Sequence, residues 1–269
     1  MTRRALYLET AGQPGALVVL THDALRLPCG VLLPTTSAEL PITSLMPSRL
    51  VPSAAFFVGD GAVSWTGPVG PVVVRPVREW APARPARGEV AASALEAVRA
   101  GLSGADPAVD GRLLADLASA ASGRDAYAAA SLLVGNGPGL TPSGDDVLAG
   151  FLVGAAAFGL DVAALREAVA DLAPGRTTAL SAALLWHAVR GECIDEVAAV
   201  TAVLTRQGRP GPEQVGMFAS SPEVPPMTTL ASRAVSRLLS VGHTSGAALA
   251  SGLLIAAESA LRARAGRAA

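Results

Sequence analysis

The feature that most constrains this chain is a glycine-rich stretch near its middle that leads into a long apolar segment. Residues 133–150 read Leu-Val-Gly-Asn-Gly-Pro-Gly-Leu-Thr-Pro-Ser-Gly-Asp-Asp-Val-Leu-Ala-Gly. Gly135, Gly137 and Gly139 occupy alternate positions, and glycine lets the backbone fold tightly and lets a ligand approach it closely. The apolar run from Val147 to Leu160 predicts a buried helix. We therefore expect a tight loop that feeds a helix N-terminus, where free N–H groups and a partial positive charge favour an anion.

Polar residues around the predicted helix start support this interpretation. Thr141 or Ser143 can serve as the N-cap, Pro142 suits the first helical position, and Asp146 lies three residues after Ser143, as in a shortened capping box. The alternative is structural: Asp145 and Asp146 would only complement the helix dipole, at roughly 0.3–1 kcal/mol each. The binding residues predicted from this stretch are Asn136, Gly137, Gly139, Thr141, Ser143 and Gly144.

A related pattern returns about a hundred residues later, where residues 241–246 read Val-Gly-His-Thr-Ser-Gly. Alignment of 143–150 on 245–252 matches the Ser-Gly start and the closing Gly, whereas alanines replace both aspartates. If this is an internal repeat, two helix starts face one ligand, one with carboxylates and the other with His243 and hydroxyls. The binding residues predicted here are Thr244, Ser245 and Gly246.

A third hydroxyl-rich helix start reads Gly-Arg-Thr-Thr-Ala-Leu-Ser at 175–181. Arg176 is placed to meet an anion, and Thr177 and Thr178 are further predicted binding residues. The helix continues to His187, which we interpret as a packed helical histidine rather than a ligand.

Composition excludes several chemistries. All 21 basic residues are arginine, so a Schiff-base lysine, a phosphate-loop lysine and a Ser-Lys dyad are impossible. The net charge of −1 gives no electrostatic footprint for nucleic acid. Cys29 and Cys193 match no zinc or redox spacing. His22 lies in a loop where nothing nearby supplies a nucleophile.

The same reading predicts a cytoplasmic protein without a membrane partner. The apolar stretch Ala5–Glu9 near the N-terminus is too short for a signal sequence. No segment reaches about 18 uninterrupted apolar residues, the length that predicts a membrane span.

The pattern of hydrophobic residues predicts an α+β protein with a β-rich domain at 1–80, a linker at 81–88 and an all-α domain at 89–269. Short β-type runs separated by turn residues favour a small barrel or sandwich, and the sequence Gly-Asp-Gly at 59–61 indicates a hairpin. The predicted strands are Ala5–Glu9, Ala16–Leu20, Leu25–Leu33, Ala54–Val58, Ala62–Trp65 and Pro71–Val77.

Beyond the linker the hydrophobic residues recur with the period of helices. The helical segments are Val90–Leu102, Asp110–Ala121, Arg124–Leu133, Asp146–Leu160, Val162–Leu172, Thr178–Arg190, Ile194–Gln207, Met227–Leu239 and Ser245–Arg264. Gly150 and Gly154 share one helix face, which predicts close packing against another helix. The long stretch 208–226 reads as either a lid over the second motif or a disordered loop.

The motifs at 135–150 and 242–246, together with Thr177, Thr178 and Ser181, resemble the AllH-like family. One member of that family is a subunit of the bacterial oxamate carbamoyltransferase. The resemblance covers most of the helical domain and suggests the β-rich N-terminal region too. In the family the second motif carries an Asp after Gly-His-Ser-Ser-Gly, and this chain has alanines there.

The resemblance implies two partner proteins, an FdrA-like subunit of the acyl-CoA-synthetase type and a second family subunit. It also implies reversible transfer of a carbamoyl group between phosphate and an amide or amine. In allantoin breakdown this reaction is phosphorolysis of oxalurate to oxamate and carbamoyl phosphate.

Three hypotheses follow. In the first, the 135–146 loop binds a small anionic substrate through backbone N–H groups, Asp145 or Asp146 orients a donor or acts as a general base, and His243 assists a developing oxyanion or shuttles a proton. This chemistry needs no cofactor. In the second, Asp145 and Asp146 hold Mg²⁺ for hydrolysis. In the third, the chain is a non-catalytic subunit that holds its partners. A homo-oligomer is compatible with each.

Overall fold

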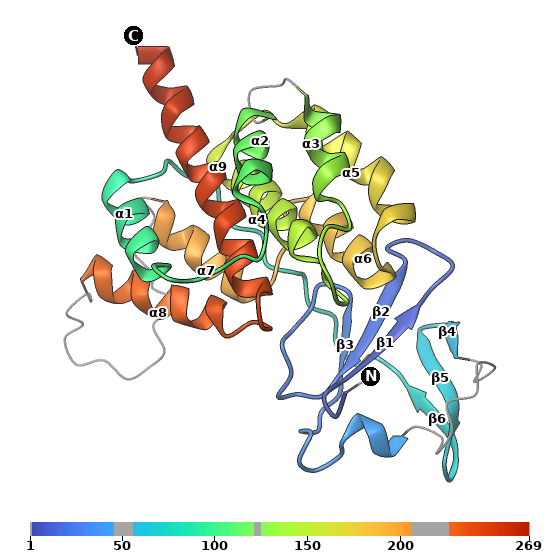
Figure 1. Ribbon diagram of the computed structural model, residues 1–269. Coiled ribbons are helices and arrows are strands. Elements are labelled where there is room, and N and C mark those ends of the chain that lie inside the picture. The colour runs from blue at the N-terminus through green and yellow to red at the C-terminus, as the bar shows by residue number, and fades with distance from the viewer. Residues whose placement is uncertain (1, 46–55, 121–124, 206–225, 269) are drawn as a thin grey trace.

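The computed structural model describes residues 2–45, 56–120, 125–205 and 226–268, and it consists of a β-rich N-terminal part followed by a helical part (Figure 1). The predicted α+β class is therefore confirmed. The described strands form two three-stranded sheets rather than one closed sheet.

The first sheet contains β1 (Ala5–Glu9), β2 (Ala16–Leu20) and β3 (Gly30–Leu32). β1 pairs antiparallel with β2, and β2 pairs parallel with β3. The side chains alternate along each strand, so one face of the sheet packs on the second sheet and the other face packs on the helical part. The residues on the first face are Leu6, Leu8 and Val19, and those on the other face are Ala5, Val18 and Leu20.

The second sheet contains β4 (Phe57–Gly59), β5 (Ala62–Gly67) and β6 (Gly70–Val74), preceded by a 3₁₀ turn at Ile42–Leu45. All its pairs are antiparallel. Asp60 and Gly61 join β4 to β5 with φ of 50° and 65°, the two positive angles of a type I′ turn, so the predicted hairpin is confirmed.

Two predicted strands are longer than the structure shows. The run Leu25–Leu33 contributes strand only at β3, after Pro28, which has no N–H for a ladder. The run Pro71–Val77 ends as strand at Val74, shortly before Pro76. The predicted strand Ala54–Val58 begins outside the described residues.

Every predicted helix is present, with ends shifted by a few residues. The helices are α1 (Ala92–Gly101), α2 (Gly111–Ala120), α3 (Ala126–Leu133), α4 (Ser143–Phe158), α5 (Ala163–Arg176), α6 (Ala179–Ala188), α7 (Asp195–Leu204), α8 (Met227–Leu239) and α9 (Ser245–Ala268). The segment 81–88 lies against the helical part. Ala83 forms a bridge with Cys193, and the Gly88 N–H donates to the Ala157 carbonyl at 3.0 Å.

Helices α4 and α9 cross at the centre of the helical part (Figure 1), with their N-termini side by side. At the crossing, a methyl group on Gly150 would overlap the Leu249 carbonyl, and a methyl group on Gly252 would overlap the Val147 carbonyl. One turn further on, Gly154 lies against the Ala256 methyl group. The close packing predicted for Gly150 and Gly154 is therefore confirmed.

These contacts are reciprocal. In the alignment of 143–150 on 245–252, Gly150 corresponds to Gly252 and Val147 corresponds to Leu249. The glycine of each helix therefore packs against the carbonyl at the equivalent position of the other helix. The weak sequence repeat thus matches a pair of helices that meet in an approximately two-fold arrangement.

Among the described residues, one helix, Ser245–Arg267, is long and apolar enough to cross a membrane by length and composition. Its most apolar window is half buried inside the protein, as for a core helix. The predicted lid or disordered loop at 208–226 lies outside the described residues except for Pro226.

The crossing gives a first prediction. Gly252→Ala should lower the free energy of unfolding by at least about 2 kcal/mol, because its methyl group has no space beside the Val147 carbonyl. Gly266→Ala in the same helix is the matched control, since nothing lies within 4 Å of its added methyl group, and it should be neutral or slightly stabilising. Urea denaturation measures both. Equal stability of the two variants would contradict the close crossing.

Candidate functional site

The glycine-rich loop before α4 depends on backbone conformations that other residues rarely adopt. Gly135, Gly137 and Gly139 have φ of 75°, 115° and 95°. A side chain on Gly135 would also overlap the Arg176 carbonyl. The tight loop predicted from the alternating glycines is therefore confirmed, and its outer residues 136–140 are exposed.

The start of α4 differs from the predicted cap. Pro142 is the N-cap, Ser143 is the first helical residue, and no side chain caps the helix. The Pro142 carbonyl accepts from the N–H groups of Asp145 and Asp146 at 3.0 and 3.2 Å, and the Gly144 N–H donates to the Asn136 carbonyl at 2.8 Å. The predicted cap at Thr141 or Ser143, the predicted first helical position of Pro142 and the capping box are therefore wrong. Main-chain carbonyls already satisfy these three amides.

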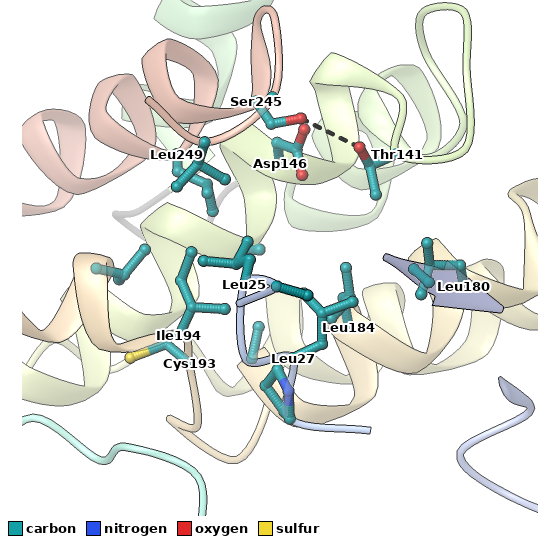
Figure 2. Close-up of a pocket in the computed structure, with 18 of the residues that line it drawn as sticks. Leu25, Leu27, Thr141, Asp146, Leu180, Leu184, Cys193, Ile194, Ser245 and Leu249 are labelled. Carbon is teal, nitrogen blue, oxygen red and sulfur yellow. Dashed lines mark hydrogen bonds between the residues drawn. The ribbon is translucent and has the colours of Figure 1, made fainter. Parts of the chain in front are cut away.

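The two glycine-containing motifs meet at this corner. The Thr141 hydroxyl lies 3.1 Å from the Ser245 hydroxyl (Figure 2), and the Ser143 hydroxyl lies 3.3 Å from that of Thr244. The two helix starts therefore meet, and that they face one ligand stays a prediction.

Asp145 joins three segments. Its Oδ1 accepts from the Gly135 N–H at 2.8 Å, and its Oδ2 accepts from the Ser181 hydroxyl at 2.7 Å and from the Thr177 hydroxyl. The side chain is almost fully buried, and this burial raises the pKa of Asp145, although the three hydrogen bonds oppose the rise. Asp145 therefore ties the loop and the α5–α6 turn to α4.

Asp146 has a different environment. The residue is 6% exposed, and its buried Oδ2 has no hydrogen-bond partner within the described part of the chain. Figure 2 shows its carboxyl group beside the hydroxyls of Thr141 and Ser245, above an apolar chamber. Burial raises the pKa of Asp146 to about 7 and the charge of Asp145 adds to the rise, while hydrogen bonding from Ser245 and Thr141 opposes it. This carboxyl group can therefore exchange a proton near neutral pH.

The chamber is a cavity of about 300 Å³ between the first sheet and the helical part. Its wall is mainly apolar and includes Leu20, Leu25, Leu27, Val153, Leu184 and Leu249. Two other charged residues at the wall have partners of their own. Arg4 pairs with Asp23 at 3.3 Å, and Glu192 pairs with Arg84 and with His187 Nδ1 at 2.6 Å.

The other predicted site residues surround this corner. Thr178 caps α6 by accepting from the Ser181 N–H at 3.1 Å, and its hydroxyl donates to the Leu140 carbonyl. Gly246 lies against the Leu238 carbonyl of α8. The exposed predicted residues are Asn136, Gly137, Gly139, Arg176 and His243.

His243 lies in the turn before α9, next to Thr244, so it belongs to the same corner but does not line the cavity. His187 is buried and bonded to Glu192, which confirms its interpretation as a packed histidine. Burial raises the pKa of Cys193 to about 12, so the thiol stays protonated.

The aspartate pair offers a poor ligand set for Mg²⁺. Both oxygens of Asp145 already accept hydrogen bonds, which leaves Asp146 as the carboxylate free to bind a cation. Across the described ranges no group of three or more His, Cys, Asp or Glu side chains gathers in a way that could hold a metal.

Sequence reasoning missed the β-rich side of the cavity. Leu25 and Leu27 lie in the β2–β3 connection, more than a hundred residues before Asp146. Their apolar character predicts part of a strand, and no local pattern shows that this connection covers the start of α4.

The fold and the site define an α+β protein in which two related helix starts enclose a buried carboxyl group. Residues 133–257 match the family model described as oxamate carbamoyltransferase subunit AllH, so the resemblance found in the motifs is confirmed. This match spans a little under half of the chain and contains every predicted site residue. No curated protein and no solved structure matches the chain.

The contacts of Asp145 predict a structural role. Asp145→Ala should lower the free energy of unfolding by about 2–4 kcal/mol, because it leaves the Gly135 N–H and two buried hydroxyls without their acceptor. Asp171→Ala, which removes the same charge from an exposed position on α5, should change stability by less than about 0.5 kcal/mol. Chemical denaturation gives both values. An Asp145→Ala variant as stable as the wild type would contradict the structural role of Asp145.

The pKa of Asp146 predicts a pH dependence of stability. Folding raises this pKa from 3.8 to about 7. At a pH between these two values, Asp146 is therefore protonated in the folded state and ionised in the unfolded state. The contribution of this titration to the free energy of unfolding is fully present below about pH 4 and is lost as the pH rises through 7. The loss amounts to roughly 4 kcal/mol at most.

Asp146→Asn removes this titration. The variant should therefore gain stability relative to the wild type as pH rises from 4 to 7, with no further gain above about pH 8. Denaturation midpoints at several pH values test this. A difference between the two proteins that does not change with pH would show that the Asp146 pKa is not raised.

Proposed function

We propose that this chain is a subunit of an assembly of the oxamate carbamoyltransferase type and that Asp146 is its proton-transfer group. The observation that carries the proposal is the buried carboxyl group of Asp146, which lies between the two motifs and lines the cavity, and whose Oδ2 has no hydrogen-bond partner in the described part of the chain. The match of residues 133–257 to the AllH family supports the reaction class.

The reaction needs one proton to move at nitrogen. When an amide nitrogen attacks the carbamoyl carbon of carbamoyl phosphate, a C–N bond forms and the C–O bond to phosphate breaks. The electron pair of that bond leaves with phosphate, and the nitrogen loses a proton. Ionised Asp146 accepts this proton, and in the reverse direction neutral Asp146 returns it to the departing nitrogen. A pKa of about 7 serves both directions at neutral pH.

The other residues of the corner have supporting roles in this proposal. Thr141 and Ser245 hold the Asp146 carboxyl group and offer hydroxyls to the substrate. Asp145 is a positioning residue, because its oxygens are occupied by Gly135, Thr177 and Ser181. His243 is exposed beside the corner and does not line the cavity, so its assistance to a developing oxyanion stays a prediction.

The anionic half of the site is proposed to involve partner subunits. The N–H groups of Gly144, Asp145 and Asp146 at the start of α4 already donate within the protein, and the other charged residues at the cavity wall are paired. Carbamoyl phosphate is a strongly charged ligand that needs cationic or N–H groups. We propose that the exposed loop 136–140 and Arg176 share this binding with the FdrA-like and second subunits.

A non-catalytic role is the second candidate, favoured by these same occupied amides. The two roles differ in what happens when Asp146 is changed, since a scaffold that only holds its partners has no use for an ionisable group in a cavity. The geometry disfavours the Mg²⁺-dependent alternative, because both oxygens of Asp145 already accept hydrogen bonds.

Reconstitution tests the proposal. The chain is assembled with its FdrA-like and second subunits, and carbamoyl phosphate is offered with a panel of primary amides that includes oxamate. Asp146→Asn should lower kcat about a hundredfold or more while the assembly stays intact. Asp171→Asn, an exposed control, should keep the wild-type rate. An Asp146→Asn assembly that transfers at the wild-type rate would remove Asp146 from the chemistry and favour the scaffold.

A further inference from the structure

The cavity at Asp146 carries information about the ligand that the reaction class does not. Apart from Asp146, Thr141 and Ser245, its wall close to α4 is apolar. On α4 itself, Asp146, Ala149 and Val153 line the cavity at positions i, i+3 and i+7, which form one stripe of the helix. Leu184 of α6 and Leu249 of α9 face this stripe, and Leu25 of the β2–β3 connection closes the cavity from the sheet side (Figure 2).

This wall disfavours a charged ligand. A carboxylate or phosphate placed among these side chains would lose its water without gaining a cation, because Arg4 already pairs with Asp23 at the rim. It would also lie near the carboxyl group of Asp146. Oxamate, a primary amide that ends in a carboxylate, therefore fits the polar end of the cavity and not its body.

A neutral carboxamide matches the polar end. It has an N–H donor and a carbonyl acceptor side by side, and a carboxyl group that holds its proton offers the complementary acceptor and donor. The Asp146 carboxyl group lines the cavity, and pairing with a carboxamide there offsets part of the cost of its burial. The hydroxyls of Thr141 and Ser245 lie at the same end.

We infer that this cavity binds an uncharged primary amide or ureide with an apolar substituent, with the carboxamide at Asp146 and the substituent between α4, α6 and the β2–β3 connection. The inference rests on the proposed function, since it names the acceptor class of the same site. A volume of about 300 Å³ suits a small ligand, at the lower end of ordinary binding pockets.

The test is direct binding to the 269-residue chain by titration calorimetry or ligand-observed NMR. The probes are butanamide, hexanamide and cyclohexanecarboxamide, with oxamate, hexanoate and hexylamine as matched comparisons. The amides should bind, and each added methylene should strengthen binding about fourfold. Oxamate and hexanoate should bind at least tenfold more weakly than hexanamide.

Two variants locate the binding. Ala149→Leu fills the cavity one turn from Asp146 and should abolish amide binding without lowering the melting temperature. Ala164→Leu, an exposed change on α5, should bind as the wild type does. Asp146→Leu removes the polar partner and should weaken every amide at least tenfold while reducing the preference for hexanamide over hexanoate.

Each other result overturns the inference. Stronger binding of hexanoate or hexylamine than of hexanamide would show that a charge, not an amide, is recognised. Failure of all three amides to bind, or binding that Ala149→Leu leaves intact, would show that the cavity is not the site. Transfer to oxamate without binding of apolar amides would keep the proposed function and reject this ligand class. Amide binding without any carbamoyl transfer would support this ligand class and reject the proposed function.

Discussion

The contact between α4 and α9 is the constraint on which the rest of the site depends. Their backbones approach so closely that only hydrogen fits at Gly150 and Gly252. This approach sets the N-terminus of one helix against that of the other, which brings Thr141 to Ser245 and Ser143 to Thr244. Two motifs a hundred residues apart thereby become one corner. A wider crossing would separate the hydroxyls and open Asp146 to water.

Adjacent aspartates in this corner have different roles because their neighbours differ. The Asp145 carboxyl group accepts hydrogen bonds from the loop, from the α5–α6 turn and from α6, so it holds these segments together. Successive residues on a helix point about 100° apart, and Asp146 therefore faces another way, towards a cavity that the β-rich part closes. There it keeps one oxygen free and a pKa of about 7. The proposed chemistry and the proposed ligand class both depend on this difference.

Much of the architecture could be predicted from local patterns. The runs Ala5–Glu9, Ala16–Leu20 and Met227–Leu239 coincide with β1, β2 and α8 because their periodicity is clear and turn residues bound them. The cap of α4 could not be predicted. Ser143 and Thr141 are good capping residues, but the carbonyls of Pro142 and Asn136 accept from the N–H groups at the start of α4. The two hydroxyls instead contact residues at the start of α9. Local propensity does not include a partner helix that arrives a hundred residues later.

The sequence by itself determined the α+β class, the need for glycine at 135, 137 and 139, and the family motifs, because each of these depends on residues that are neighbours along the chain. The tertiary structure alone decided that the Asp145 carboxyl group is fully hydrogen-bonded and that the Asp146 carboxyl group keeps one oxygen without a partner. It also decided that an apolar cavity, closed by Leu25 and Leu27, lies beneath that acid. The physical reason is that desolvation and hydrogen bonding depend on which distant segments surround a group. No pattern in a single stretch of sequence contains that information.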